Sequence, residues 1–149
     1  MNKARKKDKS ETILIISGDN DVLEDITQVF AICMPSIIVK IIKKTGNLTQ
    51  VINALQPELI ILDLNGNHVD SFNLLSKIRH ESNVPLITMS YIRDRALAIR
   101  ALELEADRHI TKPFNHLEFV AQVKACLRRS QAKFEHLGRK WKIKREVVM

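Results

Sequence analysis

The stretch Glu58-Leu59-Ile60-Ile61-Leu62-Asp63-Leu64-Asn65 decides the fold class of this sequence. Its four consecutive large apolar residues are typical of a strand buried on both faces, as in a parallel sheet covered by helices. The apolar run ends in Asp63. In an open α/β sheet, a polar side chain at the carboxyl end of a central strand lies at the crevice where ligands bind. Asp63 is therefore the first candidate functional residue.

Strand and helix patterns alternate on both sides of this stretch. Short apolar runs predict strands at residues 12–16, 37–42, 59–62, 84–89 and 108–111. Apolar residues at helical spacing predict a helix after each strand, at about residues 20–33, 48–55, 71–79, 94–105 and 115–127. This order predicts a flavodoxin-like (βα)5 doubly wound parallel sheet with strand order 2-1-3-4-5. The loops that start at Ser17, Asp63, Ser90 and Lys112 then face one site.

The composition is that of a globular protein, with 45% hydrophobic and 28% charged residues. The net charge of +7 comes from the ends: residues 1–11 hold five Lys/Arg against two Asp/Glu, and residues 128–149 hold eight against two. The mildly acidic body argues against a nucleic-acid-binding face on the core. The apolar runs are far shorter than the roughly 20 residues that cross a bilayer, and no signal peptide follows the basic start. We therefore expect a cytoplasmic protein without a membrane partner.

The thiols and imidazoles do not indicate a metal centre. Cys33 and Cys126 are far apart in the sequence and lack metal-ligand spacing, so both are expected to be small buried side chains. The five histidines also lack ligand spacing, which argues against a zinc site.

The four converging loops suggest a chemistry for Asp63. An aspartate beside a lysine ammonium and a hydroxyl can receive a phosphoryl group as an acyl phosphate. Lys112 would supply the compact cation that the phosphoryl charge needs, and Ser90 would supply a hydroxyl donor. A magnesium ion, Mg²⁺, normally completes such a site, held by carboxylates, a carbonyl and waters.

Four stretches of the chain, in order, resemble the receiver domain of bacterial two-component response regulators. They are Pro57–Leu64, Asp70–Arg79, Val84–Ser90 and Ala101–Phe114. The resemblance covers roughly residues 12–130 and is most similar to the receivers of winged-helix transcription regulators. It implies phosphorelay signalling by switching between states, not turnover as an enzyme.

The resemblance also implies a role for each matching residue. Asp63 would accept a phosphoryl group from a sensor histidine kinase, and Lys112 would pair with the phosphate. Asn65 would give its backbone carbonyl to the metal. Ser90 would bond the phosphoryl oxygen and draw its loop inward, and His109 would take the place of the family's switch aromatic, often Tyr or Phe.

Further expectations concern the bond before Pro113 and the signalling face. The Lys112–Pro113 bond resembles one that is often cis in the family. Phosphorylation would change the face around the fourth helix and fifth strand, and a homodimer would use this face together with the fifth helix. Three arginines lie on or near it and are either part of this output face or simply a solvated helix face: Arg93, Arg95 and Arg100.

The first strand departs from the family pattern. The family ends this strand with two acidic residues that hold magnesium, whereas this sequence has Ser17 and Gly18. The first carboxylate, Asp19, would reach the metal only if the loop shifts by one residue; otherwise Asp19 or Asn20 caps the next helix. Asp70 is likewise expected to be a turn or cap residue. The alternative is therefore a pseudo-receiver, which keeps the fold and signals through protein contacts without phosphate.

The two ends of the chain are expected to lie outside the receiver domain. Residues 1–11 are a basic, disordered leader, and residues 131–149 are a basic linker or the truncated start of an output domain. The alternation in Gly138–Arg145 suits a strand. Three explanations stay open: a stand-alone receiver, a truncated gene product, or a boundary chosen within a longer protein. DNA would be bound only by a missing output domain or by this tail, where Trp141 could stack on bases; the alternative is a solvated tail.

Overall fold

The computed structural model describes residues 10–43, 46–65 and 70–136, with side chains described as far as residue 129. The strands form one parallel sheet in the order β2-β1-β3-β4-β5. They are β1 (Thr12–Ile16), β2 (Ile38–Ile42), β3 (Leu59–Asp63), β4 (Leu86–Tyr91) and β5 (Arg108–Lys112). The predicted flavodoxin-like fold and strand order are therefore confirmed.

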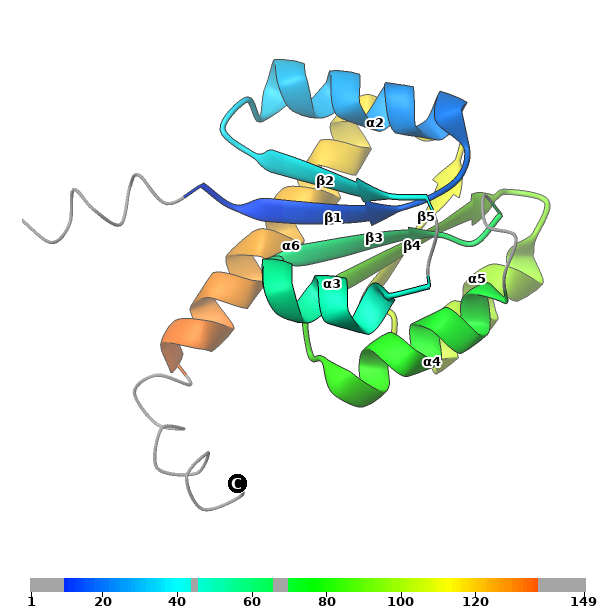
Figure 1. Cartoon of the computed structure of the whole chain (residues 1–149). Coiled ribbons are helices and arrows are strands. Elements are labelled where there is room, and N and C mark those ends of the chain that lie inside the picture. Colours follow the sequence, from blue (N-terminus) through cyan, green and yellow to red (C-terminus); the bar gives the residue numbers. More distant parts are fainter. Residues whose placement is uncertain (1–9, 44–45, 66–69, 137–149) are drawn as a thin grey trace, which may run out of the picture.

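Helices cover both faces of the sheet (Figure 1). One face carries α2 (Asn20–Cys33) and α6 (His116–His136), and the other carries α3 (Leu48–Leu55), α4 (Ser71–Glu81) and α5 (Arg95–Glu103). Each face has its own core, to which alternate residues of the central strands contribute. In β3, Leu59 and Ile61 belong to the core under α2 and α6, while Ile60 and Leu62 belong to the other. Because both faces are covered, the strand is apolar from Leu59 to Leu62, and every residue from Leu59 to Asp63 is buried.

Several predicted elements end at different residues in the structure, among them the fourth strand and the fourth helix. The fourth strand begins at Leu86 and continues to Tyr91, because Ser90 and Tyr91 still pair with Thr111 and Lys112 of β5. The helix predicted at 94–105 ends at Glu103. Glu105 has a left-handed φ of 74°, and the Ala106 N–H donates to the Ala101 carbonyl, which closes the helix end.

One of the two cysteine predictions is wrong. Cys126 is buried, and burial raises the pKa of its thiol. Cys33, however, is exposed, because it is the last residue of α2 and the chain turns back toward the sheet directly after it. Met34 and Ile37 pack against the core beyond this turn instead.

Two aspartates cap the starts of helices, and a partly buried arginine holds the far end of α4 in place. Asp19 accepts N–H bonds at the start of α2 and Asp70 does so at the start of α4, which confirms both as caps. The Arg79 guanidinium donates to Asp107 Oδ2 and to the carbonyls of Glu105 and Val84, each at 2.7 Å. These bonds join the end of α4 to the start of β4 and to the loop before β5.

The last helix runs beyond the predicted domain boundary. It extends to His136, whereas residue 130 is the end expected for the receiver. The strand expected at Gly138–Arg145 and most of the leader, residues 1–9, lie outside the described residues. The division at residues 11 and 130 therefore stays a prediction. Among the described helices, none combines the length and the apolar character that a membrane span requires.

Candidate functional site

Asp63 ends β3 as a buried carboxylate with donors on both oxygens. Its residue is 1% exposed. Oδ1 accepts a bond from Lys112 Nζ at 2.8 Å and one from the Asn65 N–H at 3.1 Å. Oδ2 accepts a bond from Ser17 Oγ at 2.8 Å. A buried charge is stable only when it is paired and hydrogen-bonded, and Asp63 meets both conditions.

The sheet register explains why these side chains meet. Ile16 of β1 pairs with Leu62 of β3, so the residues that follow, Ser17 and Asp63, are neighbours at the carboxyl edge. Lys112 ends β5, two strands away from β3, and its long side chain reaches past β4 to Asp63. On the way, Nζ lies 4.2 Å from the centre of the Tyr91 ring, which attracts cations through its negative face. Arg93 also contacts this ring, at 4.8 Å.

Ser17 occupies a position where the resemblance to receiver domains predicts a metal-binding carboxylate. It is fully buried, and its hydroxyl donates to Asp63 while accepting the Asp19 N–H at 3.0 Å. Asp19 does not share this cluster, because its Oδ1 accepts the N–H groups of Asp21 and Val22 at 3.0 and 3.3 Å. The loop therefore directs a hydroxyl to Asp63 and a carboxylate to the helix start.

The groups around Asp63 do not fit a magnesium site. Magnesium requires near-octahedral oxygen ligands and is usually bound by one or two carboxylates with waters or phosphates. Within residues 10–43, 46–65 and 70–136 no three His, Cys, Asp or Glu side chains group as metal ligands. The carboxylate of Asp63 is instead held by an ammonium and a neutral hydroxyl. The assignment of Asp19 and of the Asn65 carbonyl as ligands stays a prediction that the described contacts do not support.

Asn65 ties the loop after β3 to the loop after β4. Its amide oxygen accepts the Tyr91 N–H at 2.9 Å, and its amide nitrogen donates to Asp94 Oδ2 at 3.0 Å. Together with the bond from its own N–H to Asp63, these contacts fix the segment beside the carboxylate. Asn65 thus positions the site through its side chain as well as its backbone.

Ser90 and His109 form a second cluster. Ser90 Oγ lies 2.9 Å from His109 Nε2, and Thr88 Oγ1 lies 2.7 Å from His109 Nδ1. Both hydroxyl residues are fully buried, and burial lowers the pKa of the His109 imidazole below its ordinary value. Side chains alternate along a strand, so Thr88 and Ser90 lie on the sheet face opposite to Met89, the residue that pairs with Asp63.

The structure thus divides the residues selected from the sequence into two groups. Lys112 and Ser17 each contact Asp63, whereas Ser90 contacts His109. Two contributors were missed: Thr88, which bonds His109, and Tyr91, which covers Lys112. The position of Tyr91 directly after Ser90 was a usable signal, because the carboxyl end of β4 faces the same edge as Asp63. Thr88 gave no comparable signal within its apolar strand.

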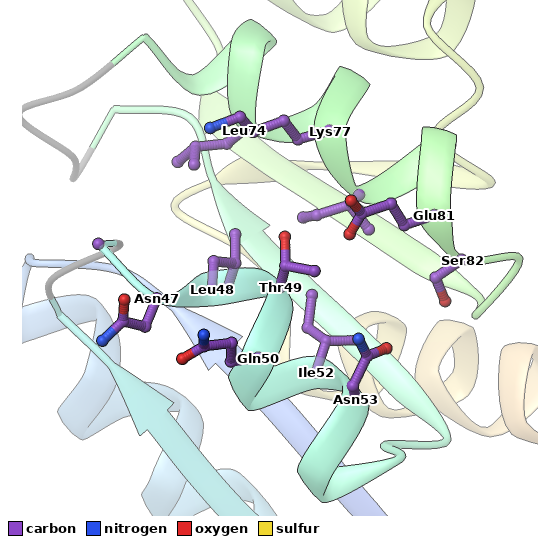
Figure 2. A pocket seen from close by; sticks show the side chains of 12 residues that line it. Asn47, Leu48, Thr49, Gln50, Ile52, Asn53, Leu74, Lys77, Glu81 and Ser82 are labelled. Carbon is purple, nitrogen blue, oxygen red and sulfur yellow. The ribbon is translucent and has the colours of Figure 1, made fainter.

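The described surface also contains a groove of about 200 Å³ between α3 and α4 (Figure 2). Its floor includes the core residues Leu48, Ile52 and Leu74, and its rim includes Lys77 and Glu81. None of the lining residues belongs to either cluster described above. The groove is therefore separate from the candidate site.

The fold and the site together define a class of protein. A doubly wound parallel sheet has a buried aspartate–lysine pair at its carboxyl edge, and the lysine precedes a cis peptide bond to Pro113, as predicted. This arrangement is that of a signal-receiving domain. The response regulator receiver domain family matches residues 13–124, and the chain belongs to that family.

Relatives with similar sequences are named as transcriptional regulators. Transcriptional regulatory protein CseB of Streptomyces coelicolor is 31% identical over 128 residues, which cover 86% of this chain and 53% of that protein. Probable transcriptional regulator ycf27 of Guillardia theta is 38% identical over 74 residues, or 50% of this chain and 29% of that protein. This chain therefore spans about half the length of CseB and less of ycf27.

Solved structures agree with the family. A two-component response regulator from Clostridium difficile has a TM-score of 0.72 and 28% identity, over 80% of this chain and 98% of that one. The receiver domain of the TMAO respiratory system response regulator TorR has a TM-score of 0.72 and 26% identity, with the same coverage. The chain thus contains a two-component receiver domain whose relatives include transcriptional regulators.

Proposed function

We propose that this chain receives a phosphoryl group on Asp63 from a sensor histidine kinase in the cytoplasm and acts as a switch, not as an enzyme with turnover. The observation that carries the proposal is the buried pair of Asp63 and Lys112, 2.8 Å apart at the carboxyl end of the central strand. The carboxylate is held ready as a nucleophile, and the ammonium beside it stabilises added negative charge.

The transfer requires one bond to form and one to break. An oxygen of Asp63 bonds to the phosphorus of the phosphohistidine, and the phosphorus–nitrogen bond breaks. The histidine nitrogen keeps the electron pair of that bond and takes up a proton. Lys112 pairs with the phosphoryl charge in the acyl phosphate, and the Ser17 hydroxyl, already 2.8 Å from Asp63 Oδ2, is a second donor.

The output of the switch would be the face around α5, β5 and α6. Three large apolar side chains are exposed near α5: Ile92, Ile99 and Leu102. Cationic Arg93, Arg95 and Arg100 are exposed in the same region. This composition supports contact with a second copy of the chain or with an output domain. Because relatives are transcriptional regulators, regulated transcription is the process that we propose, with DNA bound by an output domain or by the basic tail.

A specific observation also supports the second candidate, a pseudo-receiver that signals without phosphate. Ser17 donates to Asp63 where the family places an acidic residue, and Asp19 is used as a helix cap. Both oxygens of Asp63 are therefore bonded to groups of the protein itself. In this candidate, the paired carboxylate only stabilises the fold, and signalling depends on protein contacts at the same α5–β5–α6 face.

Intact-mass measurement after incubation with acetyl phosphate, with and without magnesium, separates the two candidates. We expect the wild-type chain to gain the mass of one phosphoryl group and Asp63→Asn to gain none. The double variant Ser17→Asp/Gly18→Asp restores the family's acidic pair and is the positive control for labelling. Labelling of this variant alone would overturn phosphorylation of the natural chain and support the pseudo-receiver. An adduct that persists in Asp63→Asn would show that another residue is the acceptor.

A further inference from the structure

His109 binds two buried hydroxyl groups through its two ring nitrogens. Its Nδ1 is 2.7 Å from Thr88 Oγ1 and its Nε2 is 2.9 Å from Ser90 Oγ. The register of β4 and β5 pairs Thr88 with His109 directly, and Ser90 follows two residues later on the same face. The ring is thus held between both hydroxyls, and an ordinary Tyr or Phe switch residue offers no such pair of nitrogens.

One tautomer of the neutral ring is compatible with all of the surrounding contacts, and we take this tautomer as the starting point. The Thr88 hydroxyl also donates to the Arg108 carbonyl, in a long bond of 3.5 Å. Since Thr88 has a single hydroxyl hydrogen, it then accepts from Nδ1–H. A neutral imidazole with its hydrogen on Nδ1 has a free electron pair on Nε2, which accepts the hydroxyl hydrogen of Ser90. Burial favours this neutral form, because it lowers the pKa of His109.

The groups around the His109 ring are consistent with a neutral imidazole. From β4 the ring meets the uncharged Thr88 and Ser90. On β5 itself, Lys112 is bound to Asp63 and Arg108 interacts with Cys126 of α6, on the other face of the sheet. The charged residues of α5, the helix that packs on β5, are all exposed: Arg95, Arg100 and Glu103. Desolvation is therefore the dominant influence on the imidazole.

We propose that His109 is a proton-dependent latch on Ser90, a positioning residue that regulates the Asp63 site. Neutral His109 accepts the Ser90 hydroxyl hydrogen and keeps it away from Asp63. Protonated His109 carries hydrogens on both nitrogens, so Nε2 no longer accepts and the Ser90 hydroxyl becomes free to donate toward Asp63 or a phosphoryl group on it. The regulatory meaning rests on the proposed function, whereas the latch itself is a property of the unmodified chain.

Nitrogen-15 NMR of the imidazole tests the latch without any phosphodonor. We expect Nδ1–H and an unprotonated Nε2 in the wild type at neutral pH. Ser90→Ala removes the donor that stabilises the neutral ring, so it raises the pKa of His109. The control Thr111→Ala changes an exposed residue of β5, the strand of His109, and leaves this pKa unchanged. A hydrogen on Nε2 at neutral pH, or the same His109 titration in Ser90→Ala and the wild type, would overturn the proposal.

The coupling to Asp63 has its own readout. The carbon-13 shift of the Asp63 carboxylate should show an inflection at the pH where His109 titrates, because the released Ser90 hydroxyl then approaches the carboxylate. His109→Phe keeps an aromatic ring and should remove this inflection. Its absence from the wild type, or its persistence in His109→Phe, would contradict the latch. Phosphoryl transfer can fail in the mass measurement while both NMR results hold, so the two proposals fail separately.

Discussion

At the scale of single residues, Asp63 and Lys112 lose their water shells together when the chain folds. Their side chains are 1% and 3% exposed, so each charge depends on the other and on nearby donors. Such a pair contributes little net stability compared with apolar residues, but removal of one partner leaves an uncompensated buried charge. The pair is therefore better explained by a functional need for a buried carboxylate than by stability.

Lys112→Ala is expected to destabilise the fold by about 3–5 kcal/mol, because the buried carboxyl group of Asp63 then lacks its cationic partner. The free energy of unfolding in urea measures this loss. Lys124→Ala removes an exposed lysine of α6 and should change the same quantity by less than about 0.5 kcal/mol. Equal losses of stability in Lys112→Ala and Lys124→Ala would show that the ion pair does not stabilise the buried carboxylate of Asp63.

His109 should make the stability of the fold depend on pH. The folded-state pKa of the imidazole lies below its ordinary value of 6.5. Well above pH 6.5 the imidazole is neutral in both the folded and the unfolded state. As the pH falls toward and below 6.5, the unfolded state binds the proton first and stability decreases. Urea unfolding across this range should therefore show that stability falls more steeply with decreasing pH in the wild type than in His109→Phe. The same pH dependence of stability in both proteins would contradict the burial of a neutral ring.

At the scale of secondary-structure elements, the loop after β1 contains two residues with different roles. Ser17 contacts Asp63, while Asp19, two residues on, begins α2. Asp19→Ala should lower stability by about 1 kcal/mol, whereas Asp19→Asn should largely preserve it because asparagine also caps helices well. Thermal or urea unfolding compares them. Two results would show that Asp19 is a ligand and not a simple cap. One is an equal loss of stability in Asp19→Ala and Asp19→Asn, and the other is a stabilisation by magnesium of the wild type but not of Asp19→Asn.

The sequence was informative about elements and less so about contacts. The apolar run before Asp63 predicts a doubly covered strand because burial on both faces leaves no room for alternation. The predicted burial of Cys33 was wrong because helical spacing shows which side of a helix faces the core. It does not show at which residue the helix extends past the edge of the core. The bonds of His109 to Thr88 and Ser90 depend on the register between β4 and β5, which no local pattern of residues specifies.

At the scale of the whole molecule, the positive charge is concentrated at the ends of the sequence. Residues 128–149 hold eight Lys/Arg against two Asp/Glu. If the receiver alone carries the function, removing residues 137–149 should leave DNA binding and its salt dependence unchanged, as measured by fluorescence anisotropy at several salt concentrations. A nucleic-acid-binding tail would instead give a weaker affinity and a shallower salt slope after truncation, because fewer counterions are released.

The identity of the phosphoryl acceptor is the central claim about this protein. Borohydride reduces an acyl phosphate to an alcohol, so it converts a phosphorylated aspartate to homoserine, which peptide mass spectrometry assigns to one residue. After treatment with acetyl phosphate and borohydride, we expect homoserine at position 63 in the wild type and no such change in the Asp63→Asn variant. An unchanged Asp63 in the wild type, or homoserine at any other aspartate, would contradict the account.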